Sequence, residues 1–199
     1  MSEIKLEIDG REVTAEEGQT ILEVASENEI DIPQLCYSKA YEPAGLCRLC
    51  LVEVRPPEGK PELKAACVYP VREGLKVETQ TDRVLKARKL TAELLLARCP
   101  DSEAVREIAN QHGVEEPRFS KKDLDCVLCG LCVRACEAAT GESVITFVGR
   151  GPDREVLTPF ELSPEECVGC GACAGVCPTN AIEMVEVEVA QEGQNSAQK

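Results

Sequence analysis

The chain has 199 residues, with 36 acidic and 22 basic side chains, so its formal net charge is −14. Nucleic-acid binding requires a concentration of Lys and Arg, so this balance argues against a nucleic-acid partner. Aromatic residues make up only 3% of the chain and Trp is absent, so aliphatic side chains must dominate any core. The acidic charge serves either solubility or docking against basic partner surfaces.

The first eight residues alternate between polar and apolar, which predicts a strand with Ile4, Leu6 and Ile8 on one face. Asp9-Gly10 then predicts a hairpin turn and a return strand. Thr20 and Glu23 have the spacing of a capping box, so a short helix should follow and end near Asn28.

Three further strand-like runs follow, at Leu51–Val54, Leu63–Val68 and Leu75–Glu78, with a turn at Pro56–Gly59. The order of hairpin, helix, cysteine-containing loop and further strands is typical of a β-grasp ferredoxin. Residues 1–80 are therefore expected to form a first domain.

Residues 81–118 are predicted to be a helical linker. Asp82 is expected to cap a helix that Pro100 ends, and Ser102 begins a shorter helix that reaches about His112. The apolar residues of the longer helix are expected to pack between the domains: Val84, Leu85, Ala87, Leu90, Leu94 and Leu95.

Residues 119–188 contain two similar cysteine runs, which indicates an internal duplication. A short strand is expected after each run, at Val144–Val148 and Ile182–Val187, with turns at Gly149–Asp153 between the halves. The tail, 189–199, lacks apolar residues that could anchor it, and is expected to be disordered.

Twelve of the thirteen cysteines fall into three groups of four. The first group has a single cysteine, then C-x2-C, then a distant cysteine, which predicts a 2Fe–2S site. A zinc site with four cysteines is the alternative, because it needs the same ligands. The members of this group are Cys36, Cys47, Cys50 and Cys67.

The other two groups each read C-x2-C-x2-C-x3-C, the pattern that holds 4Fe–4S clusters in bacterial ferredoxins. In that pattern the fourth cysteine of each run binds the cluster of the other run. One cluster is therefore expected on Cys126, Cys129, Cys132 and Cys177, and the other on Cys136, Cys167, Cys170 and Cys173. Pro178 follows the last ligand as the pattern requires, whereas Glu137 stands in place of the first proline.

Cys99 is the cysteine outside these groups, and it is interpreted as an inert buried thiol. His112 is interpreted as a residue at a helix C-terminus rather than as a ligand.

The N-terminus does not resemble a signal peptide, and no run is long and apolar enough to span a membrane. Cysteines set this close together in a reducing compartment bind metal more often than they form disulfides. The expected location is therefore the cytoplasm.

The N-terminal pattern, the C-x10-C-x2-C…C group, the helix LKARKLTAELLLAR and the paired runs together resemble a known modular unit. It occurs at the N-terminus of iron-only hydrogenases and of the large iron–sulfur subunit of respiratory complex I, and in the diaphorase small subunit of NAD-linked hydrogenases. The resemblance implies an α+β fold: a β-grasp 2Fe–2S domain, a helical linker and a bacterial-type domain for two 4Fe–4S clusters. Members often carry a further cluster with one His ligand; here Cys99 stands at that position without the other ligands, which implies its absence.

The resemblance further implies an electron-transfer subunit without a catalytic residue of its own. Its partners would be a flavin- and NAD(H)-binding subunit and a second catalytic subunit of hydrogenase or formate dehydrogenase type. No G-x-G-x-x-G dinucleotide motif occurs in the chain, so nucleotide chemistry is expected elsewhere. The alternative is a free-standing ferredoxin-like carrier or adaptor.

Overall fold

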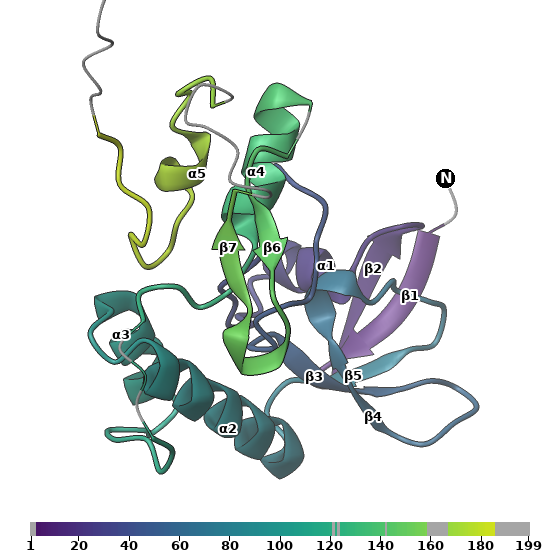
Figure 1. Ribbon diagram of the computed structural model, residues 1–199. Helices are drawn as coiled ribbons and strands as arrows, with labels where there is room; N and C mark the ends of the chain where they lie inside the picture. Colours follow the sequence, from purple (N-terminus) through teal and green to yellow (C-terminus); the bar gives the residue numbers. More distant parts are fainter. Residues whose placement is uncertain (1–2, 121, 123, 142, 159–166, 186–199) are drawn as a thin grey trace, which may run out of the picture.

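The computed structural model describes residues 3–120, 122, 124–141, 143–158 and 167–185. Figure 1 shows a sheet with a short helix against it, a pair of helices below and to one side, two helices above, and a small hairpin in the middle of the view. The elements are, in chain order, β1 (Glu3–Ile8), β2 (Arg11–Glu16), α1 (Ile21–Glu27), β3 (Leu51–Arg55), β4 (Glu62–Ala65), the 3-10 helix η1 (Ala66–Val68), β5 (Lys76–Glu78), α2 (Asp82–Arg98), α3 (Glu103–Gln111), α4 (Leu131–Thr140), β6 (Thr146–Val148), the 3-10 helix η2 (Gly151–Asp153), β7 (Glu155–Leu157) and α5 (Ala172–Gly175).

The first five strands form one mixed sheet in the order β2-β1-β5-β3-β4. β1 pairs antiparallel with β2 and parallel with β5, whereas β3 pairs antiparallel with both β5 and β4. Asp9 and Gly10, between β1 and β2, both have positive φ, as the predicted tight hairpin turn requires. This mixed sheet with a helix packed against it is the expected β-grasp arrangement.

The capping box predicted for α1 is confirmed. The Glu23 amide donates to the Thr20 hydroxyl at 3.3 Å, and the Thr20 amide donates to the Glu23 carboxylate at 2.7 Å. Both otherwise unpaired amides at the helix start are thereby satisfied. The helix ends at Glu27 with Asn28 as its cap, as predicted.

The strand predicted over Leu63–Val68 is shorter than expected. β4 ends at Ala65, which is paired with Leu51, and the chain then turns into η1. The Ala66 amide donates to the Cys50 carbonyl at 2.9 Å and closes this turn. The last residues of the predicted strand therefore lie next to the start of β3 rather than along the sheet.

The boundaries of α2 and α3 largely agree with the prediction. α2 ends at Arg98, just before Pro100, and α3 is capped by Ser102 and His112. The prediction that Asp82 caps α2 is wrong: the Thr81 hydroxyl accepts the Val84 amide at 3.3 Å, and Asp82 is the first helical residue. Thr81 takes this role because it keeps an extended backbone, as an N-cap residue does.

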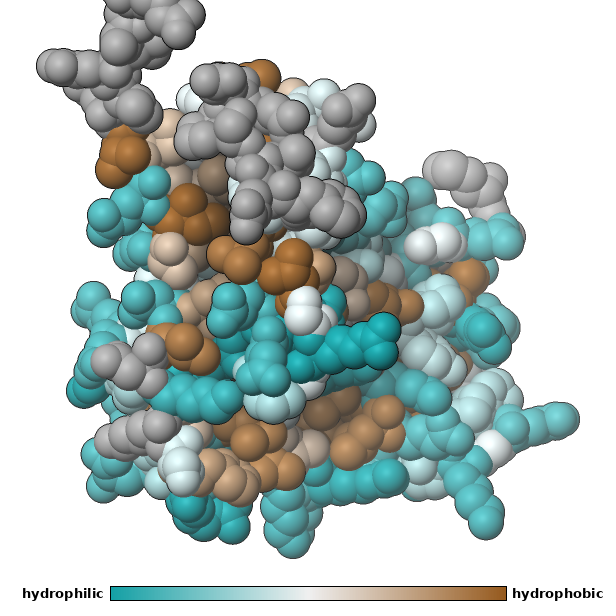
Figure 2. Space-filling view, in the orientation of Figure 1, coloured by the Kyte–Doolittle hydropathy of each residue, from teal (hydrophilic) through white to brown (hydrophobic). Residues whose placement is uncertain are grey.

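The predicted buried face of α2 is wrong for three leucines. Leu85, Leu90 and Leu94 are 43%, 44% and 50% exposed, and Figure 2 shows apolar side chains at the surface over α2, in the lower half of the view. The helix is rotated about its axis relative to the predicted orientation, because a different stripe of side chains, spaced by three or four residues, faces the remainder of the protein. That stripe consists of Val84, Arg88, Ala92, Leu95 and Leu96.

Two apolar cores hold the molecule together. The first lies within the sheet and α1. The second is formed where the loop before β3, helices α2 and α3, and the start of α4 meet, so that it joins both cysteine-containing parts of the chain. Its buried members are Cys36, Cys47, Leu49, Ala92, Leu95, Leu96, Cys99, Val105, Ala109, Val114, Val127, Cys129 and Leu131.

The C-terminal part is less symmetrical than the duplication predicts. β6 falls within the predicted strand 144–148, but its partner is β7, and η2 lies in the predicted turn between them. The strand predicted over Ile182–Val187 is wrong for 182–185, which are not in a strand; 186–187 lie outside the described residues. The predicted disorder of 189–199 also lies outside them.

The two helices of this part differ in length for a visible reason. α4 continues past Cys136 to Thr140, whereas α5 ends at Gly175, shortly before Pro178. Proline cannot continue a helix, and Glu137 at the equivalent position can. The helices lie side by side in Figure 1.

Candidate metal centres

The first cysteine group lies at one end of the β-grasp sheet. Cys36 follows α1, Cys47 and Cys50 precede β3, and Cys67 lies on η1. The pairing of β3 with β4 brings Cys50 and Cys67 to the same edge, because Leu51 and Ala65 are the last paired residues. All four side chains are buried.

The sulfur atoms of this group interact with one another. Hydrogen bonds from the Cys47 and Cys67 thiols lower the pKa of Cys36 to about 2, and one from Cys67 lowers the pKa of Cys50 to about 7. The same contacts raise the pKa of Cys47 and Cys67. The Cys47 amide also donates to the Cys36 sulfur, with N and Sγ 3.4 Å apart. Four sulfurs in one network with a backbone donor suit a cluster with four cysteine ligands, whose potential such donors tune.

Within the described residues, no three His, Cys, Asp or Glu side chains converge as they would around a single metal ion. An iron–sulfur cluster does not need such convergence on one point, because its cysteine ligands are distributed over several iron atoms.

Arg88 on α2 supplies a buried positive charge beside this group. Its side chain is 2% exposed, and its Nε donates to the carbonyl of Leu51, the neighbour of Cys50, at 2.9 Å. Nη2 is buried and has no hydrogen-bond partner in the described part of the chain. Burial lowers the pKa of Arg88, and the nearby Cys50 acts in the opposite direction. A buried cation is costly without a counter-charge, so a net negative cluster on these cysteines fits the site.

Three cysteines of the second group and two of the third line a cavity of about 190 Å³ in the C-terminal part. Its walls are largely apolar and come from the loop before α4, the β6–β7 hairpin and the segment after α5. The cysteines that line it are Cys126, Cys129, Cys132, Cys173 and Cys177. The structure thus brings Cys177 together with the three cysteines of the earlier run, and Cys173 as well.

Burial raises the pKa of Cys129, and raises that of Cys132 to about 11. Backbone amides donate to two other sulfurs of this cavity: Leu128 to Cys126 at 3.4 Å and Ala181 to Cys177 at 3.2 Å. A set of buried thiols with amide donors around a cavity fits a 4Fe–4S cluster.

The third group is less closely assembled. Cys136 is buried on α4 and Cys173 is half-buried on α5, whereas Cys167 and Cys170 are exposed on the segment before α5. Burial raises the pKa of Cys173, and the charges of Cys136 and Cys167 act in the same direction. Cys173 therefore lies within electrostatic range of both Cys136 and Cys167, and Cys167 and Cys170 are both at the surface.

The two cysteine runs share a backbone conformation that the sequence alone did not indicate. Leu128 and Gly130 have φ of 57° and 69°, and Gly169 and Gly171, at the equivalent positions, have φ of 64° and 71°. Left-handed backbone at these two places curves the chain around the site, and a leucine there bears the strain that glycine avoids. This shared geometry supports the duplication at the level of the loops.

Cys99 and His112 are not among the proposed cluster ligands. Cys99 is fully buried among Val105, Ala109 and Val114, and burial raises its pKa to about 12. The His112 ring nitrogen Nδ1 lies 2.9 Å from the Ile108 carbonyl at the end of α3. Both positions agree with the interpretation of an inert thiol and a helix-end histidine.

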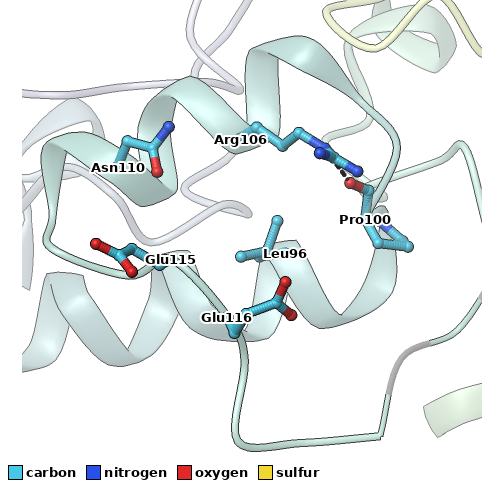
Figure 3. Close-up of a pocket in the computed structure, with 6 residues that line it drawn as sticks. All are labelled: Leu96, Pro100, Arg106, Asn110, Glu115 and Glu116. Atoms are coloured by element: carbon cyan, nitrogen blue, oxygen red, sulfur yellow. Dashed lines mark hydrogen bonds between the residues drawn. The ribbon is translucent and has the colours of Figure 1, made fainter.

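A pocket of about 110 Å³ lies between α2 and α3. Figure 3 shows Arg106 reaching towards Pro100, whose carbonyl accepts from its Nε at 2.5 Å. Two carboxylates, of Glu115 and Glu116, come from the segment after α3. The described residues of this lining include no thiol or imidazole, so they do not provide the ligands of a cluster.

Comparisons with known proteins assign both ends of the chain. Residues 1–82 match the family described as 2Fe-2S iron-sulfur cluster binding domain, and residues 125–181 match the 4Fe-4S dicluster domain. The chain thus carries a segment similar to a 2Fe-2S cluster binding domain, followed by a segment similar to a 4Fe-4S dicluster domain. The match of residues 1–82 favours the 2Fe–2S interpretation of the first group over zinc.

The full-length relatives agree with this. The chain is 32% identical to the NADP-reducing hydrogenase subunit HndD of Solidesulfovibrio fructosivorans, over 92% of this chain and 36% of the relative. It is 31% identical to the NADPH-Fe(3+) oxidoreductase subunit alpha of Geobacter sulfurreducens, over 90% of this chain and 24% of the relative. It thus spans about a quarter to a third of the length of these curated relatives.

A solved structure shares the fold over most of both chains. A chain in the crystal structure of an NAD+-reducing [NiFe]-hydrogenase in the H2-reduced state has a TM-score of 0.69 and 27% identity, covering 89% of this protein and 86% of that chain. The predicted resemblance to this group of proteins is confirmed. Among the described residues, no helix is long and apolar enough to cross a membrane.

Proposed function

We propose that this protein binds one 2Fe–2S cluster and two 4Fe–4S clusters and passes electrons between them. The first cluster would be held by Cys36, Cys47, Cys50 and Cys67. The two 4Fe–4S clusters would have crossed ligands: Cys126, Cys129, Cys132 and Cys177 for one, and Cys136, Cys167, Cys170 and Cys173 for the other. When bound, the clusters supply the one-electron chemistry, and the chain supplies ligands, burial and hydrogen bonds.

The observation that best supports crossed ligands is the cavity that Cys177 shares with Cys126, Cys129 and Cys132. These residues are separated by up to about fifty positions in the chain, and the fold nevertheless directs them to one space. Cys173 also lines this cavity, so geometry alone leaves it beside both sets. Its assignment to the other cluster rests on the sequence pattern and on its proximity to Cys136.

The domain division proposed from the sequence assigns 1–80 to the 2Fe–2S domain, 81–118 to the linker, 119–188 to the two-cluster domain and 189–199 to a tail. The linker carries α2 and α3, which contribute to the core that joins both cluster-binding parts. In this scheme its role is to fix the distance over which electrons move.

We further propose that the chain acts within a multi-subunit NAD(H)- or NADP(H)-linked oxidoreductase. The relatives are named as subunits of NADP-reducing hydrogenase and NADPH-Fe(3+) oxidoreductase, and the structural neighbour is an NAD+-reducing hydrogenase. The proposed partners are a flavin- and NAD(H)-binding subunit and a second catalytic subunit. Relatives that are named as subunits favour this over a free-standing carrier.

The proposed location is the cytoplasm, because closely spaced cysteine ligands need a reducing compartment to remain thiolates. The formal charge of −14 would favour docking against basic surfaces of the partners.

Three measurements test this proposal. Anaerobically purified protein should contain about ten irons per chain, the sum of one 2Fe–2S and two 4Fe–4S clusters. Its EPR spectrum, recorded after stepwise reduction, should contain separate 2Fe–2S and 4Fe–4S signals. Iron near six, or the lack of a 2Fe–2S signal, would contradict the ligand sets. Purification of the native complex should yield a flavin-containing subunit in equal amount; an isolated monomer would favour the carrier instead.

A further inference from the structure

Arg134 contacts the loops of two proposed clusters at once. It lies on α4, between Cys132 and Cys136, and its guanidinium reaches back to the loop that follows α1. Nη2 donates to the Cys36 carbonyl at 2.6 Å, and Nη1 donates to the Glu42 carbonyl at 2.8 Å. The side chain therefore ties the C-terminal part to a residue 98 positions away in the 2Fe–2S domain.

The same guanidinium also binds the loop that begins α4. Nε donates to the Gly130 carbonyl at 3.2 Å, and Nη2, which already contacts Cys36, lies 3.4 Å from the Cys129 carbonyl. One nitrogen thus joins the backbone of a proposed 2Fe–2S ligand to that of a proposed 4Fe–4S ligand. The planar fork of Arg suits this task, because its donors are fixed relative to one another.

The two loops also touch directly beside this residue. A Cβ atom at Gly130 would lie 2.9 Å from Cδ1 of Leu46, the neighbour of Cys47, and φ at Gly130 is +69°. Glycine therefore permits the close approach of the loops. Arg134 and this close approach therefore both connect the two loops.

All four acceptors of Arg134 are neutral carbonyl oxygens. In the described part of the chain, the salt bridges do not include Arg134, so no carboxylate there neutralises it at ion-pair distance. Clusters held by thiolates carry negative charge that increases on reduction, and a nearby positive charge favours the reduced form.

We propose that Arg134 is a positioning residue for electron transfer between the 2Fe–2S cluster and the 4Fe–4S cluster nearest to it. It fixes the spacing of the two loops, and its charge stabilises the reduced form of both clusters. In the transfer one electron leaves one cluster and enters the other, and Arg134 is neither oxidised nor reduced. This inference rests on the ligand sets of the proposed function.

The test compares Arg134→Lys, which keeps the charge but not the fork, with Arg134→Met, which removes both. Each variant of the full chain is purified anaerobically, and its iron content, its reduction potentials and the magnetic splitting between reduced clusters are measured by EPR. Arg83→Met is the matched control, because Arg83 also donates to a backbone carbonyl, that of Pro61 at 3.0 Å, but is exposed on α2.

Arg134→Met should retain its iron, lose the wild-type splitting and shift the reduction equilibrium of both clusters about tenfold towards the oxidised form, which is about 59 mV for a one-electron couple. Arg134→Lys should lose the splitting but largely keep the potentials. Arg83→Met should change neither.

Unchanged splitting in Arg134→Lys overturns the positioning role, even if Arg134→Met fails to assemble its clusters. Unchanged potentials in an iron-replete Arg134→Met overturn the role of the charge. The wild-type spectrum separates this inference from the proposed function: a missing cluster signal there rejects the ligand sets themselves, and with them the role of Arg134.

Discussion

The β-grasp region and the C-terminal region achieve cluster binding in different ways. In the first, five strands and α1 enclose a continuous apolar core, and all four cysteines are buried at its edge. In the second, α5 has four residues, β6 and β7 have three each, and Val168 beside Cys167 is 72% exposed. We infer that the first site is shaped by the polypeptide, whereas the second depends on its clusters for part of its core.

Removal of the clusters should therefore affect the two regions unequally. In apo-protein prepared by anaerobic chelation, the amides of 124–141 and 167–185 should lose most of their protection from hydrogen exchange, because metal binding energy there is also folding energy. The amides of β1, β3 and β5 should stay protected. Hydrogen exchange with mass spectrometry measures both regions in one sample. Equal loss in both would show that the sheet also depends on its metal.

Substitution of Cys177 should remove one cluster and leave the 2Fe–2S site intact. Cys177→Ala takes a ligand from the cavity of Cys126, Cys129 and Cys132, so iron should fall from about ten to about six or fewer per chain. The 2Fe–2S EPR signal should persist. Cys99→Ser is the control, since Cys99 is buried outside the proposed ligand sets. If the variant kept the cluster on Cys126, Cys129 and Cys132 and lost only the cluster on Cys167, Cys170 and Cys173, the crossed ligands would be contradicted.

Substitution of Arg88 should change a potential more than it changes stability. A unit charge about 7 Å from a cluster, at an effective dielectric constant of about 20, contributes about 2 kcal/mol. Arg88→Met should therefore lower the 2Fe–2S potential by on the order of 100 mV, at 59 mV per tenfold change for one electron. Apo-protein should not be destabilised in proportion, because the unpartnered Nη2 is removed together with its burial cost.

Arg88→Lys keeps the charge, so its 2Fe–2S reduction potential should stay close to that of the wild type. Redox titration followed by EPR measures both variants, and the 4Fe–4S potentials provide an internal reference. A potential in Arg88→Met equal to that of the wild type would show that the cluster is not the counter-charge of Arg88.

The smallest effect concerns acid stability of the connecting segment. The Arg118 guanidinium and amide bind the Glu93 carboxylate at 2.6–2.7 Å and lower its pKa to about 2. A depressed folded-state pKa gives stability that is present above the ordinary value of 4.5 and is lost as the pH falls from there towards 2. Glu93→Gln should therefore reduce stability at neutral pH and flatten its dependence on pH below 4.5.

Thermal unfolding of apo-protein between pH 3 and 7 would measure this. Glu62→Gln is the control, because Glu62 pairs with Lys64 on the surface of the sheet, where both side chains are well exposed. An exposed pair contributes little, so this variant should resemble the wild type. A steeper pH dependence in Glu93→Gln than in the wild type would contradict the role of Arg118.

Local chemistry could be predicted well from the sequence. The alternation in β1, the capping box of α1 and the end of α2 before Pro100 each depend on neighbouring residues, and each is confirmed. Cluster type could also be predicted from spacing, because three of the four proposed ligands of each 4Fe–4S cluster lie close together in the chain, and the family matches agree.

Features that depend on distant packing could not be predicted. Leu85 and Leu94 satisfy a helical pattern, yet the buried stripe of α2 passes through Arg88, a residue that the pattern assigns to solvent. Arg88 binds a carbonyl 37 positions away, and Arg134 binds one 98 positions away. The strand expected after the second run is absent over 182–185 for the same reason: β6 pairs with β7 instead.

The exposure of Cys167 and Cys170 has a consequence for the sensitivity of the protein to oxygen. A thiolate at the surface is the first to meet oxidants and to proceed towards sulfenic and higher acids, whereas buried thiolates are shielded. The edge of the molecule that carries these two cysteines is therefore its expected point of oxidative damage. Spectra followed during exposure to oxygen should lose 4Fe–4S absorption before the 2Fe–2S signal fades, so the chain should decay from its C-terminal end inwards.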